Sequence, residues 1–154
     1  MTITWLLSRR NCNYEEENGQ EEEEDDKKKR ILIVDDEVDI TNSFSLALED
    51  SGLFEVDTYN DPLVALSNYR PNFYDLLLLA IQMPKMNGFE LHQKIRKMDN
   101  KVKVCFISSY NVDYTALREQ IPSLELDCFI SKNTIRKPIE ISKLIKRIES
   151  ELLT

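Results

Sequence analysis

The segment Tyr74-Asp-Leu-Leu-Leu-Leu-Ala-Ile81 decides the fold, because it contains four consecutive leucines that lead directly into Ala80. A strand that is apolar on both faces belongs in the interior of a parallel sheet, where helices cover both sides. We therefore expect this segment to be the central strand of a parallel sheet.

On both sides of this strand, short apolar runs alternate with amphipathic stretches, which is typical of strands and helices that take turns along the chain. The predicted strands are residues 31–34, 54–59, 74–81, 102–107 and 128–130. The predicted helices are residues 38–51, 62–69, 89–98 and 112–120, and a last one that includes residues 139–148. Connections this tight require right-handed crossovers with helices on both faces. The sequence thus predicts an α/β fold with a doubly wound, five-stranded parallel sheet.

Two helix ends carry recognisable signals. Gly52 follows the apolar face of the first predicted helix and can adopt the left-handed conformation that stops a helix. Asn60 and Asp61 stand before Pro62, so capping side chains precede a proline at the first turn of the second helix. Both boundaries are therefore predicted from local chemistry alone.

The first 28 residues differ in composition from the rest of the chain. They contain the acidic runs Glu15–Glu17 and Glu21–Asp26 and offer few apolar side chains to bury. The remaining residues are about the size of one ordinary domain with its own core. We predict a disordered charged tail at residues 1–28 and one domain at residues 29–154.

Charge and cysteine content narrow the function classes. The net charge of -8 and the pI of about 4.8 argue against nucleic acid and anionic membranes as partners. The apolar patch Ile3–Leu7 is too short for a membrane span or signal peptide. Cys12, Cys105 and Cys128 lack the spacing of a zinc site or a disulfide framework, which favours a reducing cytoplasm. His92 has no partner at metal-ligand spacing and is expected at the surface.

Polar side chains follow the predicted strands at the edge where doubly wound sheets bind ligands. Asp35 and Asp36 follow the first strand, Ala80 ends the middle strand, and Ser108 and Ser109 follow the fourth. Charged groups are rarely buried unpaired. The two carboxylates therefore indicate either a solvated pair at a helix N-terminus or a site for a hard cation, completed by a backbone carbonyl and waters.

Three stretches resemble the signature sequences of CheY-like response-regulator receiver domains. They are Ile31-Leu-Ile-Val-Asp-Asp-Glu37, the segment from Tyr74 to Leu91, and Ile135-Arg-Lys-Pro-Ile139. The resemblance runs from about Lys29 to the C-terminus and implies a flavodoxin-like sheet order, 2-1-3-4-5. It also implies a role in two-component phosphorelay signalling. The family carries an acid pair that binds Mg2+, an aspartate that takes phosphate from a histidine kinase, and a hydroxyl and a lysine that contact the phosphate.

The resemblance assigns roles residue by residue. Asp35 and Asp36 correspond to the acid pair, and the backbone carbonyl of Gln82 corresponds to the remaining protein ligand of the metal. Ser108 corresponds to the phosphate-contacting hydroxyl. Phe129 corresponds to the aromatic residue that changes rotamer when a receiver domain of this family is phosphorylated.

Ala80 stands where the family has its phosphoacceptor aspartate. A methyl group cannot attack phosphorus or coordinate Mg2+, so we expect no phosphorylation at the usual position and a weakened magnesium site. The nearest carboxylate on the same strand, Asp75, lies about 17 Å earlier and cannot substitute. Because three crowded carboxylates repel one another, we also expect the chain to be more stable without metal than its Ala80→Asp variant.

The motif lysine has two candidates. Lys132 lies three residues after Phe129, as in the family, whereas Lys137 precedes Pro138 and matches the family's Lys-Pro pair. Either residues 133–137 are inserted after the motif lysine, or the strand end has shifted to Lys137. Strand register favours Lys132.

Two function classes follow. The leading hypothesis is a stand-alone receiver that is not an enzyme, because the chain ends at Thr154, soon after the last predicted helix. Its partners would be proteins such as a histidine kinase or a downstream output protein. The alternative is a small metal-dependent phosphohydrolase with an aspartate nucleophile. Haloacid-dehalogenase-like phosphatases need Asp-x-Asp, whereas Asp35-Asp-Glu-Val38 stands here.

Overall fold

The computed structural model describes residues 28–108, 119 and 129–153. The described elements are β1 (Lys29–Val34), α3 (Val38–Asp50), β2 (Phe54–Tyr59), α4 (Pro62–Ser67), β3 (Leu76–Ala80), α5 (Gly88–Arg96), β4 (Lys103–Ser108), β5 (Phe129–Ser131), the 3-10 helix η2 (Lys132–Arg136) and α7 (Pro138–Leu153). Several predictions lie outside the described residues: the tail before residue 28, the helix at 112–120 apart from residue 119, and Ser109, Cys12 and Cys128.

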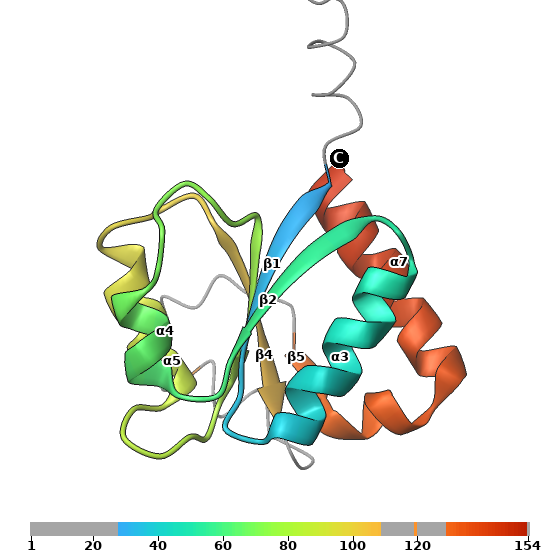
Figure 1. Ribbon diagram of the computed structural model, residues 1–154, viewed down its shortest axis with the longest axis horizontal. Helices are drawn as coiled ribbons and strands as arrows, with labels where there is room; N and C mark the ends of the chain where they lie inside the picture. The colour runs from blue at the N-terminus through green and yellow to red at the C-terminus, as the bar shows by residue number, and fades with distance from the viewer. Residues whose placement is uncertain (1–27, 109–118, 120–128, 154) are drawn as a thin grey trace, which may run out of the picture.

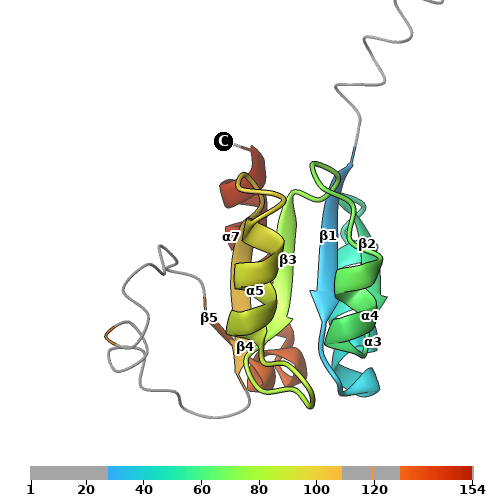
Figure 2. The same ribbon diagram turned by 90° about the vertical axis from the view of Figure 1, so that its left-hand side faces the viewer.

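The sheet has the predicted topology. All four strand pairs are parallel, and the strand order is β2-β1-β3-β4-β5. Helices α4 and α5 cover one face of the sheet, and α3 and α7 cover the other (Figures 1 and 2). The prediction of a doubly wound α/β fold with order 2-1-3-4-5 is therefore confirmed.

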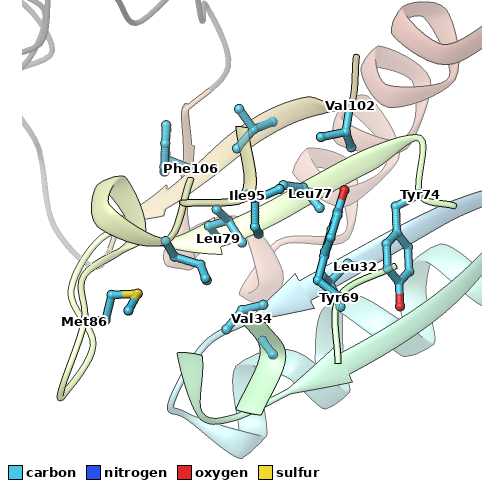
Figure 3. Packing of buried hydrophobic residues seen from close by; sticks show 13 residues of the cluster. Leu32, Val34, Tyr69, Tyr74, Leu77, Leu79, Met86, Ile95, Val102 and Phe106 are labelled. Carbon is cyan, nitrogen blue, oxygen red and sulfur yellow. The ribbon is translucent and has the colours of Figure 1, made fainter. Parts of the chain in front are cut away.

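The core consists of two apolar layers that share the central strand. Leu76 and Leu78 of β3 pack into the layer beneath α3 and α7. Leu77 and Leu79 pack into the layer beneath α4 and α5, which Figure 3 shows. All five residues of β3 are buried. An uninterrupted apolar run serves both layers because successive side chains of a strand point to opposite faces.

Local signals set the helix boundaries near the carboxyl end of the sheet. Asp61 caps α4 by accepting a hydrogen bond from the Leu63 N–H at 2.8 Å. At the start of α5, Asn87 and Glu90 form a reciprocal capping box. The next residue, Gly88, lies so close to β3 that a Cβ atom there would sit 2.2 Å from the carbonyl oxygen of Ala80. Only glycine permits this approach, so α5 begins directly beside the end of the central strand.

The predicted stop of the first helix is confirmed, since Gly52 has a φ of +79° just after α3. The central strand begins at Leu76 instead of Tyr74. Tyr74 stays outside the ladder, where its hydroxyl donates to Asp57 at 2.7 Å and its ring meets Phe73 edge-on.

One expectation about cysteine is wrong. Cys105 of β4 is disulfide-bonded. The cysteine spacing could not indicate this bond, because disulfide pairing depends on which residues the fold brings together. Within the described residues, no helix is long and apolar enough to cross a membrane.

Candidate functional site

The carboxyl ends of the strands bring the predicted residues to one edge of the sheet. Val34 pairs with Leu79, so Asp35 and Ala80 follow at neighbouring positions. Ala80 itself is the last residue of β3, and Ser108 is the last residue of β4. Lys132 follows β5 directly. We call this edge the crevice.

Asp35 is the buried acid of the crevice. It is 0% exposed, and its Oδ1 accepts a hydrogen bond from the Glu37 N–H at 2.9 Å. Its Oδ2 has no hydrogen-bond partner among the described residues, although the Lys132 ammonium lies 3.2 Å away. Burial raises the pKa of Asp35, and the nearby hydrogen bond and ammonium only partly oppose this. A buried carboxylate with an incompletely bonded oxygen is unusual for a purely structural residue.

Asn60 holds the backbone of this acid in place. Its Nδ2 donates to the Asp35 carbonyl oxygen at 2.8 Å and to the Thr41 hydroxyl at 3.1 Å. The Asp35 N–H also donates to the Tyr59 carbonyl at 3.2 Å, which extends the β1–β2 ladder by one residue. The loop after β2 and the first turns of α3 thus position the buried acid.

Lys132 is the lysine that reaches the acids. Its side chain is 13% exposed, and its ammonium forms ion pairs with Asp35 and with the Glu37 carboxylate. Burial would lower the pKa of Lys132, but the bonds to Glu37 and Asp35 outweigh it and raise the pKa. Lys137 is exposed and follows η2, so the proposed shift of the strand end to Lys137 is wrong. β5 ends at Ser131, and η2 separates the two lysines.

Ala80 lines the crevice without contributing a polar atom. It is 1% exposed, and on β3 it shares the sheet face of Leu76 and Leu78. Asp75 lies at the opposite end of the strand, just before β3 begins. There its carboxylate accepts a hydrogen bond from the Arg30 N–H at 2.9 Å. No carboxylate of β3 therefore enters the crevice.

The donors in the crevice fit Mg2+ poorly. Asp36 and Gln82 are both exposed. Both carboxylate oxygens of Asp35 already face the Lys132 ammonium, at 3.2 and 3.4 Å. In the described part of the chain, no group of three or more His, Cys, Asp or Glu side chains is arranged to hold a metal. The feature that favours a cation is Asp35 Oδ2, which accepts no hydrogen bond from the described residues and lies 3.2 Å from the Lys132 ammonium. A magnesium ion prefers a nearly complete octahedron of oxygen ligands, which these residues supply only in part.

The remaining predicted residues line the crevice and the adjoining apolar layer. Ser108 is 3% exposed and pairs in register with Ser131. Phe129 is half-buried, and its ring centroid lies 6.1 Å from that of Phe106. The aromatic therefore packs against the layer under α5.

His92 is not a surface residue, contrary to the prediction. It is half-buried on α5, meets the Phe106 ring edge-on at 5.9 Å, and lies 2.9 Å from the Arg96 guanidinium through Nε2. Burial and, to a smaller extent, Arg96 lower the pKa of His92 to about 4. A neutral ring that accepts from Arg96 satisfies these contacts.

Sequence reasoning did not single out Glu37 and Asn60. In the sequence, Glu37 is the last residue of an acidic signature and Asn60 is a predicted helix-capping residue, so neither is assigned to the site. The available signal was the run of three acids after β1, because carboxylates that crowd together beside the end of a buried strand favour a nearby cation.

Comparison with known proteins agrees with this geometry. Residues 31–149 match the family described as Response regulator receiver domain. Over 118 residues the chain is 35% identical to the transcriptional regulatory protein CpxR homolog of Haemophilus influenzae, covering 77% of the chain and 48% of that protein. It is 30% identical to the chemotaxis protein CheY of Treponema pallidum, covering 77% of the chain and 78% of CheY. The chain spans about half the length of the transcriptional regulators that it matches.

Solved structures show the same fold. A CheY-like receiver domain protein from Methanospirillum hungatei JF-1 superimposes with a TM-score of 0.63 at 29% identity, covering 81% of this chain and 94% of that one. The response regulator TrrA of Thermotoga maritima, solved in complex with Mg(2+)-BeF, gives a TM-score of 0.62 at 28% identity, covering 79% of this chain and 97% of that one.

Proposed function

Because this chain belongs to the family of response regulator receiver domains, we propose that it is a receiver of two-component signalling that is not phosphorylated at the usual position. Its output is then a set of contacts with other proteins. The input is a change in those contacts and not a phosphoryl group on β3.

One observation carries this proposal. Ala80 ends the central strand at the position that neighbours the buried Asp35, and Lys132 reaches the same crevice from the end of β5. In the family, an aspartate at the end of this strand attacks phosphorus. The methyl group of Ala80 has no lone pair to form that bond, and Asp75 is too far along the strand to replace it.

Receiver domains generally act as signalling modules, and we propose that this chain also catalyses no reaction. The proposed partners are a histidine kinase or a downstream output protein. We further propose that residues 29–154 form a stand-alone receiver in the cytoplasm, preceded by a charged tail at residues 1–28. Direct contact with nucleic acid or membrane is not part of the proposal, because the net charge of -8 disfavours both.

The other site residues keep proposed roles that follow from the family. Ser108 and Lys132 are the equivalents of the phosphate-contacting hydroxyl and lysine, and Phe129 is the equivalent of the switch aromatic. Asp35, Asp36 and the backbone carbonyl of Gln82 would hold Mg2+ only weakly, since the third carboxylate is replaced by a methyl group.

Intact-mass measurement tests the proposal. The native chain and its Ala80→Asp variant are incubated with Mg2+ and acetyl phosphate. The intact mass of each protein is then measured by mass spectrometry. We expect one phosphoryl group on the variant and none on the native chain, because only the variant offers an oxygen nucleophile at the end of β3. An Asp36→Asn control in the Ala80→Asp background should lose most of the labelling, since it removes part of the acid pair.

Two results would count against the proposal. Phosphate on the native chain would mean that the nucleophile is a different residue. Absence of label on a folded Ala80→Asp variant would mean that position 80 does not correspond to the phosphoacceptor.

A further inference from the structure

The crevice already contains a cation. The Lys132 ammonium lies 3.2 Å from Asp35 Oδ2 and 3.4 Å from Asp35 Oδ1, and it also donates to the Glu37 carboxylate. Asp35 is 0% exposed and the Lys132 side chain is 13% exposed, so this contact is shielded from solvent. Shielded charge pairs are much stronger than surface pairs, because water and salt screen them less.

The ammonium reaches these acids from a distant strand. The sheet order places β3 and β4 between β1, which leads into Asp35, and β5, which leads into Lys132. The lysine side chain must therefore extend over the ends of those two strands, and Ala80 is the last residue of one of them. A small apolar side chain at position 80 leaves this path open and offers the ammonium no competing partner.

Glu37 completes the charge balance. It is the residue that precedes α3, and its own N–H donates to Asp35 Oδ1, so the backbone at this point is fixed to the buried acid. Its carboxylate then lies on the ammonium from the solvent side. Two carboxylates from one turn of chain thus surround a single ammonium.

A divalent cation would have to compete with this ammonium. Mg2+ at Asp35 would lie beside a positive charge that is already bonded to the same carboxylate, and like charges at such short range repel strongly. The third carboxylate that would offset this repulsion is absent at position 80. The poor fit of the crevice to Mg2+ and the seated ammonium are therefore two aspects of the same arrangement.

We propose that the Lys132 ammonium is the resident cation of this crevice and that Glu37 supplies the carboxylate missing at position 80, so that the crevice is complete without Mg2+. The inference rests on the proposed function only in treating position 80 as the place where the family keeps a carboxylate. Glu37 is a positioning residue in this arrangement, because it acts by holding Lys132.

A titration with Mg2+ alone tests the first half of the proposal. The thermal midpoint and the heat of binding of the full chain are measured against MgCl2 for the native protein, for Lys132→Met, and for Lys137→Met as a control of equal charge change on an exposed lysine. We expect Mg2+ affinity to rise at least about tenfold in Lys132→Met and to stay near the native value in Lys137→Met. Equal affinity in the native chain and Lys132→Met would overturn the proposal.

A second variant tests the role of Glu37 and does not depend on the folding of Lys132→Met. Glu37→Gln should lower the thermal midpoint of the native chain, because the ammonium loses one of its two carboxylates. The same substitution should have a clearly smaller effect in the Ala80→Asp background, where the introduced carboxylate can take the ammonium. Asp36→Asn serves as the matched control, since Asp36 forms no described ion pair with Lys132.

An equal effect of Glu37→Gln in the two backgrounds would overturn the role given to Glu37. No phosphodonor is present in either experiment. Failure of these tests can therefore be distinguished from failure of the phosphorylation experiment.

Discussion

Among the described residues, each end of the sheet buries one aspartate, and the two carboxylates differ in how many hydrogen bonds they accept. Asp99, beyond α5 at the end where the strands begin, is 4% exposed. Its Oδ2 accepts from the Tyr69 hydroxyl at 2.7 Å and the Asn72 N–H at 3.0 Å. Its Oδ1 accepts from the N–H groups of Lys101 and Val102 at 3.2 and 3.3 Å. Asp35, in the crevice, accepts one backbone hydrogen bond and faces one ammonium.

The pKa values of Asp99 and Asp35 are shifted in opposite directions because the two carboxylates accept different numbers of hydrogen bonds. Burial acts to raise the pKa of both acids, but the hydrogen bonds to Asp99 outweigh it and lower that pKa, whereas burial dominates at Asp35. A carboxylate with four donors holds two loops together and has no capacity left for a ligand. A buried carboxylate with an incompletely hydrogen-bonded oxygen costs stability, and such groups are typical of sites that bind a charged group. The degree of hydrogen bonding therefore separates the structural end of the sheet from the candidate site.

The largest expected effect is the loss of the structural carboxylate. Asp99→Ala should lower the free energy of unfolding by about 3 to 4 kcal/mol, because it leaves a buried tyrosine hydroxyl and several backbone N–H groups without an acceptor. Asp35→Ala should cost less, about 1 to 2 kcal/mol, because burial already opposes the charge of Asp35 and Lys132 keeps Glu37 as a partner. Urea unfolding of the two variants measures the difference. Equal losses would remove the distinction between the two ends.

Glycine substitutions compare the two ends through the backbone. Gly88→Ala should cost about 2 to 4 kcal/mol, because the new Cβ would meet the backbone of Ala80 and move α5 away from the crevice. Gly52→Ala, near the other end, should cost only about 1 kcal/mol, since no atom lies within 4 Å of the new Cβ and only the positive φ is strained. Thermal unfolding with a calorimeter gives both values. A smaller loss at Gly88 than at Gly52 would contradict the close approach.

Adding a carboxylate to the crevice should cost an intermediate amount. Without metal, Ala80→Asp should be about 1 to 2 kcal/mol less stable than the native chain, because a second buried carboxylate beside Asp35 is repelled and desolvated. Mg2+ should restore most of this loss in the variant and change the native chain little. Urea unfolding with and without MgCl2 measures both. A variant more stable than the native chain in the absence of metal would refute this expectation.

The smallest effect concerns His92 on α5, which lies against Phe106 between the two ends. Its pKa of about 4 in the folded chain is below the ordinary value near 6.5, so the unfolded chain binds the proton first as the pH falls. The native chain should therefore lose about 1 to 2 kcal/mol between pH 6.5 and pH 4 through this residue.

His92→Gln provides the matched comparison, because glutamine can still accept from Arg96 but does not titrate. The variant should lose less stability than the native chain across this pH range, and the two should differ least at pH 8. Parallel pH profiles for the two proteins would show that His92 is not buried as the structure places it.

The sequence by itself determined the fold and the residues that stand at the carboxyl ends of the strands. The order of strands and helices followed from apolar periodicity, and the stop at Gly52 and the cap at Asp61 followed from local backbone chemistry. The strand ends, with Asp35, Ala80 and Ser108, could be located because parallel strands bring their carboxyl ends to one edge. These features depend on interactions within a few residues of each other or on a rule of topology.

Only the tertiary structure decided which charges meet. Lys132 and Asp35 are 97 residues apart, and their contact depends on the direction in which each side chain leaves its strand. Three other contacts also depend on the tertiary structure. They are the contact of Glu37 with the Lys132 ammonium, the four hydrogen bonds to Asp99, and the packing of the His92 ring against Phe106. A local pattern shows which residues are charged or apolar. The partner of a buried charge is set by packing in three dimensions. The reason is that desolvation and short-range Coulomb attraction depend on which atoms the fold brings together.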